Sequence, residues 1–527
     1  MWYNIFSKNT LREPVVVSET ERIETLENHI LKLEQENKRL HETVAYLTKK
    51  LFGKSSEKTS GLNLGEMSLF DEAEVEANSK APEPDLQQVT NYRRKKFKGQ
   101  REALLKDIPH IKQLCSLAEE DRFCERCGTS LVSVGEEYIR TEIEFIPAEI
   151  KVIDYYRETF ECRPCRKAGE SYMEKSPMPY PVIQHSMASP TTVAWVMQQK
   201  YVNAMPLYRQ EKEWQTLGVN LSRATMANWV IASSRDWLAP LVDVMHQTLL
   251  TERYIHCDET PVQVMQELGR KNTTTSYMWV YSSGQYSEHP IRIFEYQPGR
   301  SGSYPQKFLK GFQGFLHSDA YSGYNKVPGV TRCFCWAHLR RYFVDALPKD
   351  TKSPAATFAS QGIEYCNKLF EIERTLKELS DKNRKIERLK REKPVLDAFW
   401  AWVESAKNNL LPKSKSAEAV NYAINHKDGL MNYLSDGNCS ISNNLVENSI
   451  RPFTVGRRNW LFSGSPRGAA ASAIVYSVVE TAKVNGLNSY KYLKFIFSEL
   501  PGVQFGQHPE FLEDYLPWNP EVQQICK

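Results

Sequence analysis

The chain has 527 residues, of which 41% are hydrophobic and 25% are charged, and its formal net charge is +4. This composition is that of a soluble globular protein with room for several domains, and it excludes a disordered chain. A charge so near zero gives no overall attraction to nucleic acid, so any such attraction must come from local clusters. The start of the chain lacks a signal-like apolar core, and the most apolar segment, 469–479, is too short to cross a bilayer. We therefore expect a cytoplasmic protein that has no membrane partner.

A heptad repeat runs through residues 23–51. Leucines recur at every seventh position, and the other apolar position of the repeat holds Ile, Val and Leu with a single Asn37. This pattern predicts a two-stranded parallel coiled coil over residues 19–52, and so a homodimer, in which Asn37 fixes the register. The alternative is one amphipathic helix that packs on its own protein. The heptad residues are Ile23, Leu26, Ile30, Leu33, Leu40, Val44, Leu47 and Leu51.

Residues 53–115 have no sustained periodicity and are predicted to form a linker. Its charge changes sign along the chain: residues 66–85 hold seven acids and one Lys, and residues 91–112 hold eight Lys or Arg and two acids. Such a change is typical of a solvated linker, and a basic arm is the alternative.

Two Cys-x-x-Cys pairs follow, Cys124 with Cys127 and Cys162 with Cys165, joined by a strand-like segment. Without secretion, paired cysteines favour metal over disulfides. Four thiolates complete the tetrahedral shell of a structural Zn²⁺, so residues 116–175 are predicted to form a zinc ribbon around one zinc ion.

Residues 186–248 are predicted to be helical and to resemble a helix-turn-helix. Residues 217–222 read as a tight turn, and Ser222 is placed to cap the next helix, which begins at Arg223. In a helix-turn-helix this second helix, with Arg223, would contact DNA. Plain helical packing gives the same pattern, and the sequence leaves both readings open.

From residue 252 the sequence changes to strands. ERYIHC, SYMWVYSS and IRIFEY are three strand-like segments, SYPQKFLKGF is helical, and GFLHSDAYSGY is a fourth strand that ends at Asp319. This order opens a ribonuclease-H-like domain, so the chain is predicted to be a multidomain α+β protein. Residues 350–435 are helical and highly charged, and their Lys and Arg are predicted to be a solvated face. The predicted parts are a ribonuclease-H-like core over 250–347 and 441–490, a helical insertion over 348–440 and a C-terminal tail over 491–527.

Three carboxylates are candidates for one site. Asp258 follows the first strand and Asp319 the fourth, and a ribonuclease-H-like sheet puts those strands side by side at its centre. A third acid usually comes from a later helix, and Glu447 is the candidate, with Ser442 as its cap. Clustered carboxylates bind two Mg²⁺ or Mn²⁺ ions together with a substrate phosphate, whereas zinc suits them less. The neighbouring Glu259 would point to the opposite side of the strand and is assigned a supporting role.

Basic residues accompany the acids and are predicted to contact DNA, because guanidinium groups bind phosphate bidentately. The tryptophans nearby, Trp336 and Trp460, are expected in the core. Cys333 and Cys335 are expected to be buried thiols, since with His338 they give too few metal ligands. The predicted DNA contacts are His338, Arg340, Arg341, Arg451, Arg457 and Arg458.

At this point the chain resembles a known group, the insertion-sequence 66 family of DDE transposases. The resemblance covers nearly the whole length, and several long motifs occur in the family's order. One departure is Ser489, where the family tends to have Pro. The motifs are LFGKSSEK (51–58), the two cysteine pairs, CDETP (257–261), HSDAYSGYN (317–325), CWAHLRR (335–341), NNLVENSIRPFTVGRRNWLFSGSPRGA (443–469), ETAKVNGLNSYKYL (480–493) and YLPWNP (515–520).

The resemblance implies that Asp258, Asp319 and Glu447 are the catalytic acids of a ribonuclease-H-like core that a helical insertion interrupts. It also implies that the chain acts on element ends and target DNA, and that two small accessory proteins of the same element are partners. The expected activity is metal-dependent cleavage and joining of DNA. Two alternatives stay open: a dimeric DNA-binding protein with an inactive nuclease fold, and a nuclease that cuts without joining.

Overall fold

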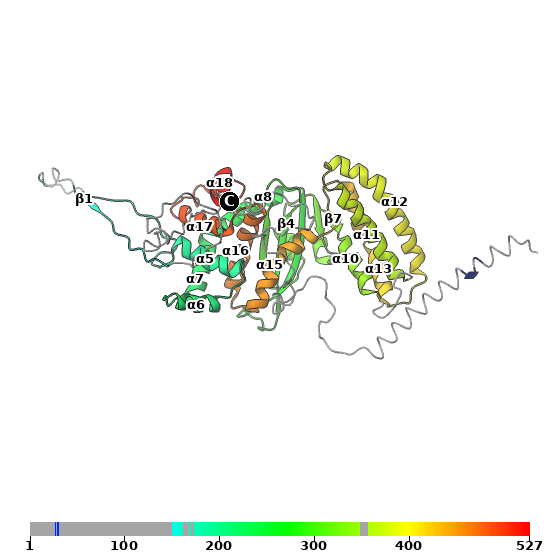
Figure 1. Ribbon diagram of the computed structural model, residues 1–527, viewed down its shortest axis with the longest axis horizontal. Helices are drawn as coiled ribbons and strands as arrows, with labels where there is room; N and C mark the ends of the chain where they lie inside the picture. Colours follow the sequence, from blue (N-terminus) through cyan, green and yellow to red (C-terminus); the bar gives the residue numbers. More distant parts are fainter. Residues whose placement is uncertain are drawn as a thin grey trace, which may run out of the picture. The chain divides into compact units, whose positions relative to one another are not determined.

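The computed structural model describes residues 27, 29, 30, 150–161, 167, 169, 173–347 and 357–527. The predicted linker and the four cysteines of the predicted zinc ribbon lie outside these residues, as does nearly all of the predicted coiled coil. The described residues from Tyr155 onward belong to one compact unit. Its elements are a mixture of helices and strands, as predicted (Figure 1).

Near the start of this unit a small ribbon precedes the helices. Its strands β1 (Thr159–Glu161) and β2 (Met173–Lys175) pair antiparallel. Four helices then follow in succession, with a π-helical segment at Ser234–Leu238. They are α5 (Pro190–Tyr201), α6 (Leu207–Thr216), α7 (Arg223–Ser233) and α8 (Ala239–Thr251).

The turn between α6 and α7 has the capping predicted from the sequence. The Ser222 hydroxyl accepts a hydrogen bond from the Thr225 amide at 3.1 Å, which satisfies one of the free donors at the start of α7. The helix buries Met226, Trp229 and Val230 and contacts α5, α6 and α16 (Pro466–Val484). Its N-terminus is exposed. One face of α7 is buried in the protein, and contacts with DNA would use the opposite face. The packing therefore does not test a role of α7 in DNA binding, which stays a prediction.

A mixed sheet forms the centre of the unit, in the strand order β5-β4-β3-β6-β7. The first three strands in sequence pair antiparallel, whereas β3 with β6 and β6 with β7 are parallel. The first and fourth strands are therefore neighbours, as predicted. Between them in the sequence lies α9 (Ser303–Phe308). The strands are β3 (Tyr254–Val264), β4 (Thr275–Ser283), β5 (Arg292–Gln297), β6 (Phe315–Ser318) and β7 (Thr331–Phe334).

Strand β3 is longer than the sequence predicted. It continues through Asp258 and Pro261 to Val264, so Asp258 lies within the strand and the prediction that it follows the strand is wrong. β3 pairs with β4 along most of its length, but its other edge pairs with β6 only over Tyr254–His256 and with β8 (Phe462–Ser463) only at its far end. Acids and proline are tolerated where one edge has no partner strand.

After β7 comes a short helix, α10 (Trp336–Asp345), and then a set of helices with their own core. Trp336 is buried there, as predicted, and its indole nitrogen donates to the Leu430 carbonyl at 2.8 Å. A 3-10 turn at Asn432–Ser435 leads back to the sheet. The helices are α11 (Phe358–Leu376), α12 (Asp381–Lys407), α13 (Lys415–Asn425) and α14 (Lys427–Met431).

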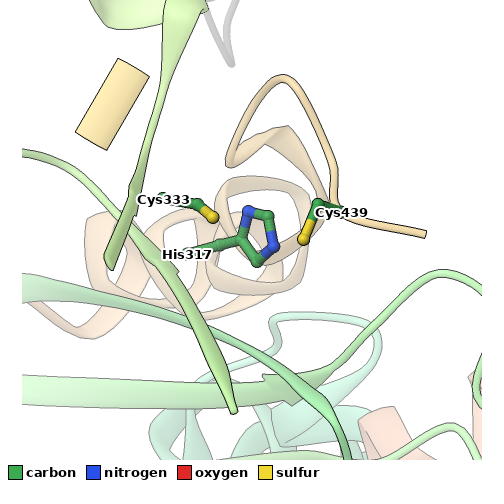
Figure 2. A group of neighbouring side chains, drawn as sticks. All are labelled: His317, Cys333 and Cys439. Carbon is green, nitrogen blue, oxygen red and sulfur yellow. The ribbon is translucent and has the colours of Figure 1, made fainter. Parts of the chain in front are cut away.

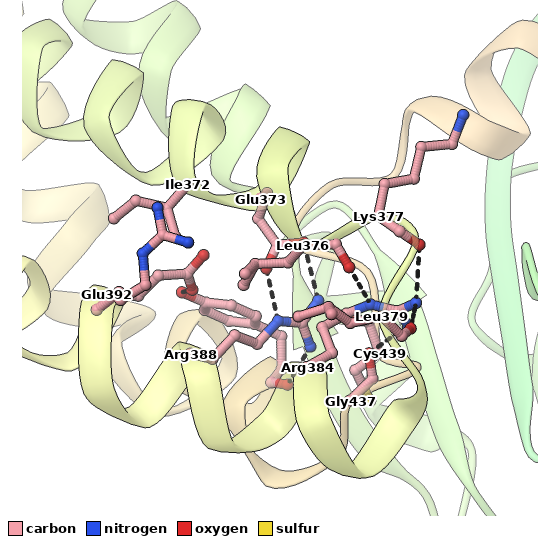
Figure 3. Close-up of polar contacts among 12 residues, drawn as sticks. Ile372, Glu373, Leu376, Lys377, Leu379, Arg384, Arg388, Glu392, Gly437 and Cys439 are labelled. Atoms are coloured by element: carbon pink, nitrogen blue, oxygen red, sulfur yellow. Dashed lines mark hydrogen bonds and ion pairs between the residues drawn. The ribbon is translucent and has the colours of Figure 1, made fainter.

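The charges of α12 are not all on a solvated face, which corrects the sequence prediction. Arg384, Arg388 and Glu392 are 3%, 2% and 0% exposed. Figure 3 shows the two guanidinium groups pointing into the space between α11 and the chain that follows α14. Arg388 pairs with Glu373 and also donates to backbone carbonyls, one of them that of Cys439. Burying the two guanidinium groups requires such pairing, which local sequence does not reveal.

The last part of the chain returns to the sheet. Helix α15 (Asn444–Trp460) contacts β3 and β4, α16 contacts β5, and α17 (Ser489–Glu499) packs on α5. A 3-10 helix (Pro509–Tyr515) and α18 (Pro520–Cys526) complete it. Among the described residues, no helix combines the length and the apolar character that a bilayer span requires.

Candidate active site

Asp258 is half-buried at the centre of β3, opposite Val280 of β4. Its Oδ1 accepts a hydrogen bond from the Glu259 amide at 2.9 Å. Burial raises the pKa of the Asp258 carboxyl well above its usual range, and the charge of Glu259 raises it further. Glu447 and Asp319 also contribute to this rise in pKa. Three carboxylates far apart in the sequence therefore act on one another in this region.

Asp319 is the residue that follows β6, as predicted. Its Oδ1 accepts a hydrogen bond from the Tyr321 amide at 3.0 Å, the short-range turn typical of Asp at the end of a strand. Arg332 of β7 donates to its backbone carbonyl at 2.9 Å and to the Ser318 hydroxyl at 2.6 Å. The backbone of Asp319 is thus held from the neighbouring strand, while its carboxylate stays half-exposed.

Glu447 lies in the first turn of α15, as predicted, but Ser442 is not the cap. The N-cap is Asn443, whose side chain makes no capping hydrogen bond. It bonds to β3 instead: its amide nitrogen donates to the Cys257 carbonyl at 2.9 Å, and its Oδ1 lies 3.0 Å from His256 Nδ1. This contact holds the start of α15 against β3, next to Asp258.

The Glu447 carboxylate lacks a hydrogen bond on one oxygen. Its Oε1 is buried and has no hydrogen-bond partner. This oxygen lies 3.6 Å from His338 Nδ1, which also has no hydrogen-bond partner. Oε2 lies 3.5 Å from the Arg341 guanidinium. Burial lowers the pKa of His338, while the charge of Glu447 acts in the opposite direction. A buried oxygen without a partner is costly, and a bound cation would remove that cost.

Glu259 has partners of its own, which agrees with the supporting role predicted for it. Its carboxylate pairs with Arg300 at 2.5 Å and accepts a hydrogen bond from the Tyr324 hydroxyl at 2.5 Å. Arg300 also lies 3.7 Å from Asp319 Oδ2. Arg300 therefore links Glu259 to a candidate catalytic acid. The sequence analysis missed it, because it follows a strand 41 positions after Glu259 without a recognisable motif.

The predicted DNA contacts differ in their exposure. Arg223, Arg341, Arg451 and Arg458 are exposed, whereas Arg340 and Arg457 are half-buried. The two half-buried side chains are bonded within the protein: Arg340 donates to Asn367 at 2.8 Å, and Arg457 donates to the Pro261 carbonyl and to the Thr260 hydroxyl. Arg457 thus holds α15 against β3. Each bond uses only one nitrogen of the guanidinium group, so direct DNA contact by either residue stays a prediction.

Cys333 and Cys335 are buried thiols, as predicted, but they belong to two different clusters. Cys335 comes together with His338 and Glu447, with all ligand atoms within 4.8 Å of one another. Its sulfur accepts a hydrogen bond from the backbone amide of Asn443 at 3.1 Å. Cys333 comes together with His317 and Cys439, again within 4.8 Å. Cys439 was missed, because it follows the helical insertion and stands in no motif.

Comparison with known families gives four matches along the chain. The description "Transposase IS66 family" matches residues 185–471, which is more than half of the chain. The zinc-finger binding domain of transposase IS66 matches residues 121–166, which hold all four cysteines of the predicted ribbon. "Transposase C of IS166 homeodomain" matches residues 39–112, and "IS66 C-terminal element" matches residues 477–518.

Individual relatives come from Sinorhizobium fredii. The protein named "Uncharacterized protein y4jD" is 28% identical over 513 residues, covering 92% of this chain and 95% of the relative. The one named "Uncharacterized protein y4hP" is 29% identical over 415 residues, covering 75% and 73%. Among solved structures, the Drosophila P element transposase strand transfer complex aligns at a TM-score of 0.30 with 14% identity, over 56% of this chain and 92% of that one. That TM-score is too low to support a statement about the fold.

Proposed function

Because this chain belongs to the IS66 family of transposases, we propose that it binds the ends of an insertion sequence, cleaves the DNA by metal-dependent hydrolysis, and joins the freed 3′ hydroxyl ends to target DNA. The observation that carries this proposal is that the fold brings Asp258, Asp319 and Glu447 to one region of the sheet. These residues come from a central strand, from the end of its parallel neighbour, and from a helix that is fixed to the same strand.

The catalytic core is proposed to be ribonuclease-H-like, with the helical insertion between Asp319 and Glu447. The strand order β5-β4-β3-β6-β7 supports this, since three antiparallel strands are followed by two parallel ones and the first strand lies beside the fourth. The unpaired edge of β3 between the β6 and β8 pairings leaves the Asp258 region open to α15 and to substrate.

The three acids fit hard divalent cations. Their donors are carboxylate oxygens, and one of them, Glu447 Oε1, is buried without a partner. We propose that Asp258, Asp319 and Glu447 hold two Mg²⁺ or Mn²⁺ ions. When bound beside a scissile phosphate, such ions activate the attacking oxygen and stabilise the leaving oxygen.

The protein's own contribution is to hold the acids in place. Asp258 is fixed by the pairing of β3, Asp319 by Arg332 and the Tyr321 amide, and the start of α15 by Asn443. Arg300 offsets the negative charge of Glu259 and Asp319. These contacts fix the backbone that carries the three acids.

DNA is proposed to lie along the exposed basic residues near the acids. Arg341 is 3.5 Å from Glu447, and Arg451 is exposed one helical turn after Glu447. A guanidinium beside the acids would pair with the DNA backbone and set its register, without reading the base sequence. His338 lies close to Cys335 and Glu447 and is proposed to approach the scissile phosphate.

Two further features are proposed for the part of the chain outside the described residues. Cys124, Cys127, Cys162 and Cys165 hold one structural Zn²⁺, which the zinc-finger match over 121–166 supports. The coiled coil over 19–52 joins two copies, so that one dimer can hold both element ends. Small proteins encoded by the same element are proposed as further partners.

A strand-transfer assay tests the proposed activity. Purified protein is mixed with labelled duplexes that carry the element ends, with unlabelled plasmid and with Mg²⁺. The proposed function gives nicked ends and labelled plasmid joined to those ends. Nicked ends without joined plasmid would favour the nuclease alternative, and bound but intact ends would favour the DNA-binding alternative.

A further inference from the structure

A second cluster of possible metal ligands lies among the described residues. It consists of His317 of β6, Cys333 of β7 and Cys439, which stands between the helical insertion and α15 (Figure 2). The three residues are 2%, 1% and 1% exposed, and their ligand atoms all lie within 4.8 Å of one another. In Figure 2 the imidazole ring is seen between the two sulfur atoms. None of the three is a candidate catalytic acid.

The His317 ring has a free nitrogen inside this cluster. Its Nε2 is buried and has no hydrogen-bond partner, while the ring also makes a hydrogen bond to the backbone of Ser440. Metal-ligating histidines usually have this arrangement: one ring nitrogen donates to a carbonyl, which fixes the tautomer, and the other binds the ion. The ring of His256 stacks on His317, with 4.3 Å between centroids and 12° between planes, and so fixes its orientation.

The backbone around Cys439 is held from the helical insertion. Arg388 of α12 donates to the Cys439 carbonyl at 2.9 Å, and Arg384 donates to the Gly437 carbonyl at 2.9 Å (Figure 3). Arg388 is itself fixed by Glu373. Cys439 is therefore positioned by contacts that do not involve its sulfur.

We propose that His317, Cys333 and Cys439 bind one Zn²⁺ ion. Two thiolates and a neutral imidazole are the donors that this borderline-soft ion prefers, and they are poor ligands for Mg²⁺. The two thiol protons leave as the ion binds, so the charge of the ion is balanced. These three side chains supply three of the four ligands of a tetrahedral zinc site, and a further group supplies the fourth.

Such an ion would connect the chain on both sides of the helical insertion. His317 and Cys333 belong to the sheet before the insertion, and Cys439 comes directly after it. His317 is two residues before Asp319, and Cys439 is eight residues before Glu447. This site is distinct from the proposed ribbon zinc and does not depend on the proposed DNA chemistry.

Metal content of the full-length protein tests this proposal. We expect two zinc ions per chain after purification with Zn²⁺ and a reducing agent, and one in each of the variants Cys333→Ala, Cys439→Ala and Cys127→Ser. Cys366→Ala, which removes a buried thiol of α11 outside the cluster, should keep two. The proposal is wrong if the wild type contains one zinc ion per chain and the Cys127→Ser variant contains none.

A second measurement needs no cluster variant and so does not depend on their folding. Zinc X-ray absorption of the wild type should show sulfur at about 2.3 Å together with nitrogen at about 2.0 Å. Cys127→Ser protein should show a larger share of nitrogen, since only the second site then holds metal. A shell of sulfur alone, or a disulfide between Cys333 and Cys439 in the purified protein, would contradict a zinc site here.

Discussion

Asp258 lies in an environment that disfavours its charge when no cation is bound. The carboxyl is half-buried within a strand, and three other carboxylates act on it. A buried acid in this position is stable only when it is protonated or neutralised by a positive ion. The same side chain therefore makes the metal-free protein less stable at neutral pH and prepares the site for a cation.

This environment predicts a pH-dependent effect of Asp258→Asn on stability. The pKa of Asp258 is raised in the folded protein, so the protonated carboxyl contributes to the free energy of unfolding. This contribution is complete below pH 3.8 and is lost as the pH rises through the raised pKa. In the presence of EDTA, the variant should melt at a higher temperature than wild type at pH 7, and the difference should shrink towards pH 4. A variant that melts below wild type at pH 7 would contradict this account of the site.

Arg300 is predicted to position the site rather than to act on DNA. It is the cationic partner of Glu259 and also approaches Asp319, so its loss leaves one buried carboxylate without its counter-charge. Arg300→Ala should lower cleavage by about 10- to 100-fold and raise the Mg²⁺ concentration required, with unchanged binding of element ends. Arg235→Ala, which removes an exposed arginine paired only with its neighbour Asp236, is the matched control. Equal cleavage by both variants would rule out this role.

The residue-scale predictions from sequence succeeded where a local motif fixes the position. Asp319 directly follows a strand and Glu447 lies in the first turn of a helix, as predicted. The position of Asp258 within β3 and the cap of α15 were predicted wrongly. β3 continues past Asp258 because β4 pairs with it as far as Gln263. The start of α15 is held by the bond of the Asn443 side chain to Cys257, 186 residues earlier in the chain.

At the scale of elements, α12 holds the helical insertion together through buried charge. Arg388 joins Glu373 of α11 to three backbone carbonyls of the segment that follows α14, Tyr433, Asp436 and Cys439. Burial raises the pKa of Glu392 to about 8, and the charge of Glu373 acts in the same direction. The insertion is thus tied to the approach to α15 as well as packed through its apolar core.

This network predicts a large cost for removing the central arginine. Arg388→Leu leaves Glu373 and the carbonyls without their donor and should lower the free energy of unfolding by about 3–5 kcal/mol. Lys390→Ala, on the solvent side of the same helix with a side chain 73% exposed, should change it by less than about 0.5 kcal/mol. Denaturant melts of the two variants check this, and equal losses would show that the buried network contributes little.

The sequence could not distinguish these buried charges from solvated ones. The sequence of α12 mixes both signs of charge along the helix, and the partners of Arg388 lie 15 to 51 residues away. By contrast, the three antiparallel strands and the fourth were predicted in order, because strand alternation and turn residues are local signals. β7 and β8 are short, at four and two residues, and were missed for that reason.

At the scale of the whole molecule, family membership rests on motifs spread along the chain, and the structure brings several of them to one place. CDETP, HSDAYSGYN, CWAHLRR and the start of NNLVENSIRPF supply Asp258, Asp319, His338 and Glu447. The zinc-finger domain predicted from the two cysteine pairs is supported by the family match over residues 121–166. The coiled coil and the bound zinc ion stay predictions.

The predicted coiled coil gives a test of assembly. Deleting residues 19–52 removes every heptad position but leaves residues 155–527 in place, so the shortened protein should be a monomer in light scattering and the full chain should be a dimer. The deletion should also reduce joint binding of two element ends without affecting binding to one. An unchanged dimer after the deletion would move the interface to another part of the molecule.

The central claim is that Asp258, Asp319 and Glu447 act together on DNA, and cleavage of labelled element ends in Mg²⁺ tests it most directly. Asp258→Asn, Asp319→Asn and Glu447→Gln should each lower cleavage by at least about 100-fold while the proteins still fold and bind the ends. The matched control is Glu480→Gln, since this buried acid of α16 is paired with Lys483 at 2.8 Å and should be dispensable for cleavage. Normal cleavage by Glu447→Gln would assign the third position to another acid, and normal cleavage by Asp258→Asn would contradict the mechanism proposed for this transposase.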